Sequence, residues 1–303
     1  MTQNSKLQFV SCLFFEKLKM FAKPRHTRSG ISGTLAFLEQ VYFGTVRGML
    51  KSSGRNAVLG LIGSMMQTVV FIMAFYFMFQ LMGVRSSPIK GDYMLYIISG
   101  IAMFMTHNTA VQAVAGSEGP TSGMMQHAPM NTMTAVCSAA LQSLYQQTIT
   151  IGAILLIYHL ALNPVDIFDP IGLAGVFLLS WFTGVAIGMV FLALTPWHPP
   201  LVKILLMVYR RVNMLASGKM FVANTLPSFM LVMFDWNPLF HCVDQARGVM
   251  FINYSPMHSN LSYPLKAAVV AVVLGLMGEF FTQNGFLQPG ERLDKDINAP
   301  HGV

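Results

Sequence analysis

Long apolar stretches separated by short polar ones dominate the hydrophobic pattern of this chain. Between Asn56 and Val84 the sequence has no Asp, Glu, Lys or Arg. At about 1.5 Å per residue, a helix over this stretch exceeds the roughly 30 Å hydrocarbon core of a bilayer. A charge at the centre of a spanning helix costs about 2.5 to 3.5 kcal/mol, so such runs are typical of transmembrane helices. The pattern predicts an all-α membrane protein with six transmembrane helices, at 57–82, 93–115, 134–160, 171–194, 204–225 and 263–283.

A different pattern precedes the first apolar run. Arg47, Lys51 and Arg55 step by four along one helical stripe, while apolar residues recur along another stripe. This spacing predicts an amphipathic helix over 34–56 that lies in the cytoplasmic membrane interface, where each basic residue contributes about 1 kcal/mol near anionic lipids. A solvated basic face ahead of a span is the alternative. The apolar stripe consists of Leu35, Leu38, Val41, Tyr42, Val46 and Met49.

The composition fits a membrane protein and sets its orientation. Of the 303 residues, 54% are hydrophobic and only 10% are charged, well under the roughly 25% of a soluble domain. With six spans, 14 Lys and Arg residues fall on the side of the two termini and 5 on the other side. The positive-inside rule then places both termini in the cytoplasm. Because the net charge of +7 follows topology rather than one domain, nucleic-acid binding is excluded.

The predicted domains follow from these patterns. A flexible cytoplasmic tail covers 1–33, the interface helix 34–56, the transmembrane domain 57–283 and a cytoplasmic C-terminal tail 284–303. Within the transmembrane domain, a second loop at 116–131 has no basic residue and is bracketed by Gly and Pro. It predicts a short helix across the cytoplasmic mouth, and a plain turn is the alternative.

The segment before the last span is broken. Pro227 ends an apolar helix, a short piece rich in Phe and Met follows, and Asn237-Pro238 breaks the helix again. A broken, partly polar segment between two spans is tolerated where protein or water satisfies its backbone. Asp244 and Arg247, three residues apart, are expected to pair within a short helix.

Together these features resemble the permease subunits of type-2 ABC transporters, in particular those that export capsular or other cell-surface polysaccharides. The similarity covers about 35–283. Its most specific part is the cluster Ser217, Gly218, Pro227, Asn237, Pro238, His241, Asp244 and Arg247. The chain departs from the family pattern in three ways: Asp244 stands where Glu is frequent, Lys219 where an apolar residue is usual, and the tail before Leu35 is longer.

The resemblance implies a homodimer in the bacterial inner membrane, with an export pathway between the two copies. A separate ABC ATPase subunit would bind ATP and Mg and supply the energy, while this chain would hold no cofactor. The second loop would be the coupling helix that docks on the ATPase, through Glu118, Met124 and Met125. The segment 226–251 would form short re-entrant helices on the outer side. Membrane lipids and a lipid-linked polysaccharide are the expected ligands, and periplasmic and outer-membrane export components are further possible partners.

Five residues are candidates for the substrate pathway. Arg210 and Arg211 are intramembrane cations whose planar guanidinium groups suit phosphate or carboxylate, and snorkelling at a helix end is the alternative. Lys219 is assigned to the same pathway. Trp236 and Phe240, with Tyr254, would stack on sugar rings, or belong to the aromatic belt of the outer interface.

No enzyme chemistry is expected in this chain. Gly218-Lys219 lacks the spacing of a phosphate-binding loop, and the three cysteines show no metal-ligand spacing, so neither catalytic nor metal-binding residues are predicted. Three other functions remain open: an ABC exporter of a drug or small lipid, an ion-driven transporter using His107, His159 or Glu279 as a proton relay, and a membrane scaffold.

Overall fold

A computed structural model describes residues 31–52, 57–81, 83, 92–117 and 132–297. The chain divides into two units, 1–39 and 40–303. The described residues of the first unit, 31–39, form the beginning of helix α2 (Ile31–Ser52), which continues into the second unit. The tail predicted over 1–33 lies outside the described residues up to position 30.

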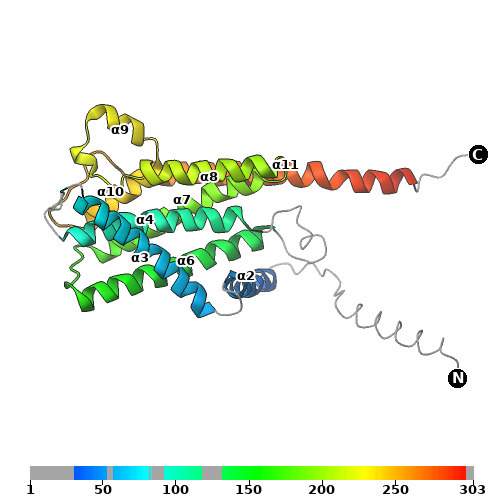
Figure 1. Cartoon of the computed structure of the whole chain (residues 1–303). Helices are drawn as coiled ribbons and strands as arrows, with labels where there is room; N and C mark the ends of the chain where they lie inside the picture. The colour runs from blue at the N-terminus through cyan, green and yellow to red at the C-terminus, as the bar shows by residue number, and fades with distance from the viewer. Residues whose placement is uncertain (1–30, 53–56, 82, 84–91, 118–131, 298–303) are drawn as a thin grey trace, which may run out of the picture. The chain divides into compact units, whose positions relative to one another are not determined.

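The second unit is helical, and the described residues contain no strand (Figure 1). Helix α4 lies in its centre and packs against α3, α6, α7 and α10. The largest apolar cluster surrounds this helix and includes Tyr96, Ile97 and Ile101 of α4 with Leu239 and Val243 of α10. Besides α2, the elements are α3 (Ala57–Leu81), α4 (Tyr93–Ala115), α6 (Thr132–Ala161), α7 (Pro170–Leu194), α8 (Pro199–Ala216), the 3₁₀ turn η1 (Ala223–Thr225), α9 (Ser228–Phe234), α10 (Pro238–Met250) and α11 (Ser262–Ile297).

Two glycines let α7 approach α4 closely. A Cβ atom on Gly184 would lie 2.5 Å from the His107 carbonyl oxygen, and one on Gly188 would lie 2.8 Å from the Val114 Cβ. Two small residues four positions apart are a frequent feature of close contacts between transmembrane helices. Residue numbers rise in the same direction along both helices at this contact, so α4 and α7 are parallel.

The same reasoning fixes the direction of α11. A Cβ on Gly275 would lie 2.9 Å from the Met189 Cβ, and one on Gly278 would lie 2.9 Å from the Ala193 Cβ. Helices α7 and α11 are therefore parallel neighbours. The residues between them must return along the length of the bundle, and α8 runs in this return direction (Figure 1).

Within the part of the chain that the structure describes, five helices are long and apolar enough to cross a membrane: α3 from Leu59, α4, α6, α7, and α11 as far as Thr282. Their positions agree with five of the six predicted spans. The predicted fifth span at 204–225 is wrong in its bounds, since α8 ends at Ala216. The helix breaks there because Gly218 takes a φ of +71°, a left-handed conformation that Gly adopts without a steric penalty. With Lys203, Arg210 and Arg211 in its 18 residues, α8 is not among the five.

Helix α2 covers residues 34–52 of the interface helix predicted over 34–56, and the last four positions of that prediction lie outside the described residues. Its part within the second unit packs on α6, where a Cβ on Gly44 would lie 2.4 Å from the Ser138 Oγ. Ser138 donates a hydrogen bond to the Val41 carbonyl at 3.2 Å. Tyr42 and Phe43 are exposed, which leaves an apolar face uncovered by the described protein.

Candidate functional site

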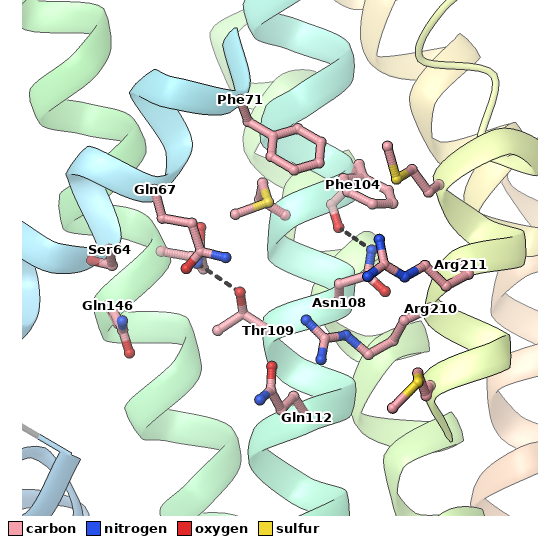
Figure 2. Close-up of a pocket in the computed structure, with 14 residues that line it drawn as sticks. Ser64, Gln67, Phe71, Phe104, Asn108, Thr109, Gln112, Gln146, Arg210 and Arg211 are labelled. Carbon is pink, nitrogen blue, oxygen red and sulfur yellow. Dashed lines mark hydrogen bonds between the residues drawn. The ribbon is translucent and has the colours of Figure 1, made fainter. Parts of the chain in front are cut away.

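A pocket of about 470 Å³ lies between α3, α4, α6 and α8, at the middle turns of these helices (Figure 2). Its lining is unusually polar for a transmembrane bundle, with two guanidinium groups, five side-chain amides and two hydroxyl groups. The polar residues are Ser64, Gln67, Asn108, Thr109, Gln112, Gln146, Gln147, Arg210 and Arg211, and the apolar ones are Phe71, Phe104, Met105, Met207 and Met214.

Two buried amides in this pocket carry oxygen atoms that have no hydrogen-bond partner among the described residues, Asn108 Oδ1 and Gln147 Oε1. Their amide nitrogens are bonded: Asn108 donates to the Phe104 carbonyl at 3.2 Å, and Gln147 donates to Thr109 Oγ1 at 2.9 Å (Figure 2). A buried acceptor without a donor is unfavourable by about 1 to 3 kcal/mol. Both oxygen atoms are buried from solvent, so a ligand with hydroxyl or amide donors would reach them only after these side chains shift.

Arg210 and Arg211 of α8 point into the same space (Figure 2). Arg210 is half-buried and Arg211 is exposed. No described lining residue is Asp or Glu, so the site carries two positive charges without a neutralising carboxylate. Two cations without a neutralising carboxylate favour an anionic ligand, and the role predicted for these arginines in a substrate pathway stays a prediction.

A hydrogen-bonded histidine joins α8 to the centre of the bundle. The Nε2 of His107, on α4, lies 2.8 Å from the Tyr209 hydroxyl, next to Arg210 in sequence. The Nδ1 of His107 lies 3.0 Å from Thr183 Oγ1 on α7. His107 is thus a buried packing residue that fixes α8. Sequence reasoning missed this pair because 102 residues separate its members, and no local pattern joins them.

Lys219 lies beyond the aromatic residues of the pocket rather than in its lining. Its side chain is 3% exposed, and Nζ lies 3.3 Å from the centroid of the Phe104 ring. Phe104 and Phe71 contact Lys219 and also line the pocket.

The residues that carry the family resemblance gather where α8 ends and α10 begins. Asn237 caps α10 by accepting a hydrogen bond from the Leu239 amide at 3.0 Å, and its own amide donates to Asn213 Oδ1 at 2.9 Å. The Phe240 ring fills the space beside Gly218, where a Cβ would lie 2.6 Å from the ring. Phe240 is 1% exposed, so its ring is a packing element here, whereas Trp236 is 56% exposed.

Asp244 and Arg247 do not pair with each other as expected. Asp244 accepts hydrogen bonds from the hydroxyls of Tyr254 and Ser259, the latter at 2.7 Å. Arg247 instead donates to main-chain carbonyls after α8. The expectation was wrong because it considered one helix alone, while the segments on either side of α10 provide better partners. Burial and the bond to Asp244 raise the pKa of the Tyr254 hydroxyl.

The remaining motif residues have structural positions. His241 is buried, and its Nε2 lies 2.8 Å from the Asp235 carbonyl. Pro227 precedes α9, Pro238 opens α10, and the buried Ser217 caps α8. The predicted coupling residues Glu118, Met124 and Met125 lie outside the described residues.

A comparison with models of known protein families finds no match, and a comparison with curated proteins finds none either.

Proposed function

We propose that this chain is the membrane permease subunit of an ABC exporter that moves a lipid-linked, anionic polysaccharide outward across the bacterial inner membrane. The observation that carries this proposal is the pocket, in which Arg210 and Arg211 meet a ring of amides and hydroxyls at mid-helix. The guanidinium groups suit the phosphate or carboxylate of the cargo. The side-chain amides that line the pocket suit sugar hydroxyls. A drug or simple lipid would leave most of these polar groups unpaired.

Six crossings, with α9 and α10 as re-entrant helices, form part of this proposal. The parallel directions of α7 and α11 support it, because a chain that crosses twice in one direction must cross back between the two helices. Helix α8 would make that crossing. At about 1.5 Å per residue its 18 residues extend about 27 Å, slightly less than the hydrocarbon core.

A homodimer would cover the outer face of α8. Leu201, Ile204, Met207, Val208 and Leu215 are exposed on this helix, next to the pocket that Arg210 and Arg211 line. A second copy, facing the same surface, would enclose the pocket between the two subunits. The energy would come from a separate ATPase subunit, docked on the loop that contains Glu118, Met124 and Met125.

The test of cargo binding is the double variant Arg210→Gln, Arg211→Gln in cells whose own copy of the gene is deleted. We expect cell-surface polysaccharide to fall by about tenfold or more, since each charge-assisted hydrogen bond contributes about 1.5 to 3 kcal/mol. Surface glycan is measured by periodate oxidation and biotin-hydrazide labelling, and the membrane level of the variant by immunoblot. Lys203→Gln, which changes an exposed cation on the same helix outside the pocket, is the matched control. Normal export by a double variant present at the normal level would overturn the proposal.

The ATPase partner has its own test. Wild-type protein purified in nanodiscs should retain an ATPase subunit in equal amount, identified by mass spectrometry, and Met124→Asp, Met125→Asp should lose it. Recovery of no ATPase with the wild type would contradict the ABC assignment. The next hypothesis to test would then be an ion-driven transporter.

A further inference from the structure

Lys219 is a buried cation held by aromatic rings. Its Nζ lies 3.3 Å from the ring centroid of Phe104, and 5.0 and 5.1 Å from those of Phe75 and Phe71. None of the described residues accepts a hydrogen bond from this Nζ. Cation–π attraction contributes about 2 kcal/mol at a desolvated site, whereas burying an ion costs several kcal/mol. The rings therefore offset only part of the cost of burying the charged form of Lys219, and an anion beside Nζ would favour that form.

The main chain of Lys219 is fixed on two sides, so any change of partner has to come from its side chain. Arg247 Nη2 donates to the Lys219 carbonyl at 2.8 Å. On the other side, Gly100 of α4 permits close contact, since a Cβ there would lie 3.2 Å from the Lys219 Cα. Lys has a flexible four-carbon stem that carries a point charge. Rotation about these side-chain bonds can carry the ammonium to a new partner once the Phe104 ring that covers it moves.

The pocket and Lys219 share one aromatic wall. The rings of Phe71 and Phe104 stack with centroids 5.9 Å apart and an interplanar angle of 26°. Both rings line the pocket that contains Arg210 and Arg211, and both contact the ammonium of Lys219. Arg210 and Arg211 lie on α8, and Lys219 follows the end of that helix. This end of α8 is directed toward α9 and α10 (Figure 1).

We propose, on the basis of the export function above, that Lys219 is a second binding station for the anionic group of the cargo. The phosphate or carboxylate oxygens bind first at Arg210 and Arg211. When the Phe104 ring turns aside, they pass to the ammonium of Lys219, which leaves the aromatic rings to meet them. The same rings keep the station closed to other ions while no cargo is bound.

The experiment follows the Lys219 side chain directly. The full chain is labelled with ¹³Cε-lysine in nanodiscs, and the Lys219 signal is assigned as the one absent from Lys219→Met. The Phe104 ring current shifts this signal upfield of exposed lysines. Two probes are titrated separately: geranylgeranyl diphosphate, which has a lipid diphosphate and no sugar, and an oligogalacturonate, which has sugar carboxylates and no lipid. Binding of each probe is measured in parallel by calorimetry.

We expect at least one probe to move the Lys219 signal downfield toward the position of exposed lysines. The diphosphate alone would identify the carrier phosphate as the group bound, and the oligogalacturonate alone would identify the glycan carboxylate. Lys219→Met should weaken binding of that probe by about tenfold to a hundredfold, the effect of one charge-assisted hydrogen bond. Lys219→Arg should restore most of the affinity, and Lys203→Met should leave it unchanged.

Met packs well against aromatic rings, so Lys219→Met is expected to fold. If a probe binds through Arg210 and Arg211 but the Lys219 signal stays in place and Lys219→Met binds and exports normally, the second station is refuted and the exporter proposal stands. If neither probe binds and the arginine double variant exports normally, both proposals are refuted.

Discussion

At the scale of single residues, Arg247 shows how a charge is accommodated in the interior of this bundle. Its guanidinium is 1% exposed, and it donates to the carbonyls of Gly218, Lys219 and Phe221 at 3.0, 2.8 and 2.6 Å. Its Cζ lies 4.2 Å from the centroid of the Tyr96 ring. The planar group thus holds three carbonyls of the turn that follows α8, which ends at Ala216.

Arg247→Lys should therefore destabilise the protein strongly. The ammonium of Lys lacks the forked geometry by which the guanidinium reaches three carbonyls. Each lost hydrogen bond from a charged donor costs about 1.5 to 3 kcal/mol, so we expect the free energy of unfolding to fall by roughly 2 to 4 kcal/mol. The thermal midpoint in detergent, followed by tryptophan fluorescence, measures this. Tyr96→Phe is the control, because the Tyr96 hydroxyl has no partner among the described residues and its removal should leave the midpoint unchanged. Equal midpoints for wild type and Arg247→Lys would contradict the role of the fork.

Asp92 caps α4 and also ties it to α6. Its carboxylate accepts hydrogen bonds from the Met94 amide at 3.0 Å, from the Tyr158 hydroxyl, and from the Asn163 amide at 2.9 Å. Partial burial raises the pKa of Asp92, but these hydrogen bonds outweigh it and hold the pKa below its usual value. The stabilisation is therefore present above the usual pKa and is lost as pH falls through the lowered one.

Asp92→Ala should lower stability by about 0.5 to 2 kcal/mol, as expected for a lost helix cap. Asp92→Asn retains an acceptor for the cap and should lose less. Thermal midpoints at neutral pH and near pH 3 separate the effect of the helix cap from the effect of the negative charge. The difference in midpoint between wild type and Asp92→Asn should be smaller near pH 3, where the charge of the wild-type carboxylate is being lost. Asp166→Ala, at an exposed carboxylate in the loop before α7, is the control. A gap that widens in acid would contradict the assigned pKa shift.

At the scale of elements, the glycine contacts decide which helices lie together. Gly184→Ala places a methyl group 2.5 Å from the His107 carbonyl, a main-chain atom that cannot move alone. Overpacking of this kind destabilises by about 1 to 3 kcal/mol. Gly152→Ala on α6 is the matched control, since nothing lies within 4 Å of the added atom there. It should be neutral or raise stability by up to about 1 kcal/mol through helix propensity. Thermal midpoints check both, and equal effects at the two glycines would argue against the α4–α7 contact.

Helix boundaries followed from the sequence where the apolar run and its end signals agree. The prediction of 93–115 matches α4, because Asp92 supplies the cap and Gly116 ends the apolar run. It failed at α8, where apolar residues continue past Ala216 and hydropathy does not register the backbone turn at Gly218. A run of apolar residues indicates a favourable free energy of transfer from water into the bilayer. The end of a helix depends instead on backbone conformation.

The candidate site was predictable only in part for a similar reason. Arg210 and Arg211 stood out because charges are rare within spans. Asn108 and Gln147, by contrast, are two of several uncharged polar residues in α4 and α6, and their shared pocket depends on how these helices rotate about their axes. Periodicity cannot give that rotation where the polar residues do not gather on one stripe of the helix.

At the scale of the whole molecule, the number of crossings determines where the two ends of the chain lie. Six crossings put both termini on one side, and five put them on opposite sides. The parallel pair α7 and α11 requires a return path, yet α8 is short and carries three cations. The question thus reduces to whether α8 crosses the membrane, which the location of the termini answers.

We expect both termini to be cytoplasmic and Trp236 to face outward. Single cysteines are introduced as Ser5→Cys, Val303→Cys and Trp236→Cys in a background with Cys12→Ser, Cys137→Ala and Cys242→Ala. In intact spheroplasts, a membrane-impermeant maleimide should label only the Trp236→Cys variant, whose native side chain is 56% exposed. Permeabilised cells should label all three, which controls for reactivity. Labelling of one terminus but not the other in intact spheroplasts would show that α8 does not cross. Arg210 and Arg211 would then lie at the membrane surface, and the pocket could not serve as an export pathway.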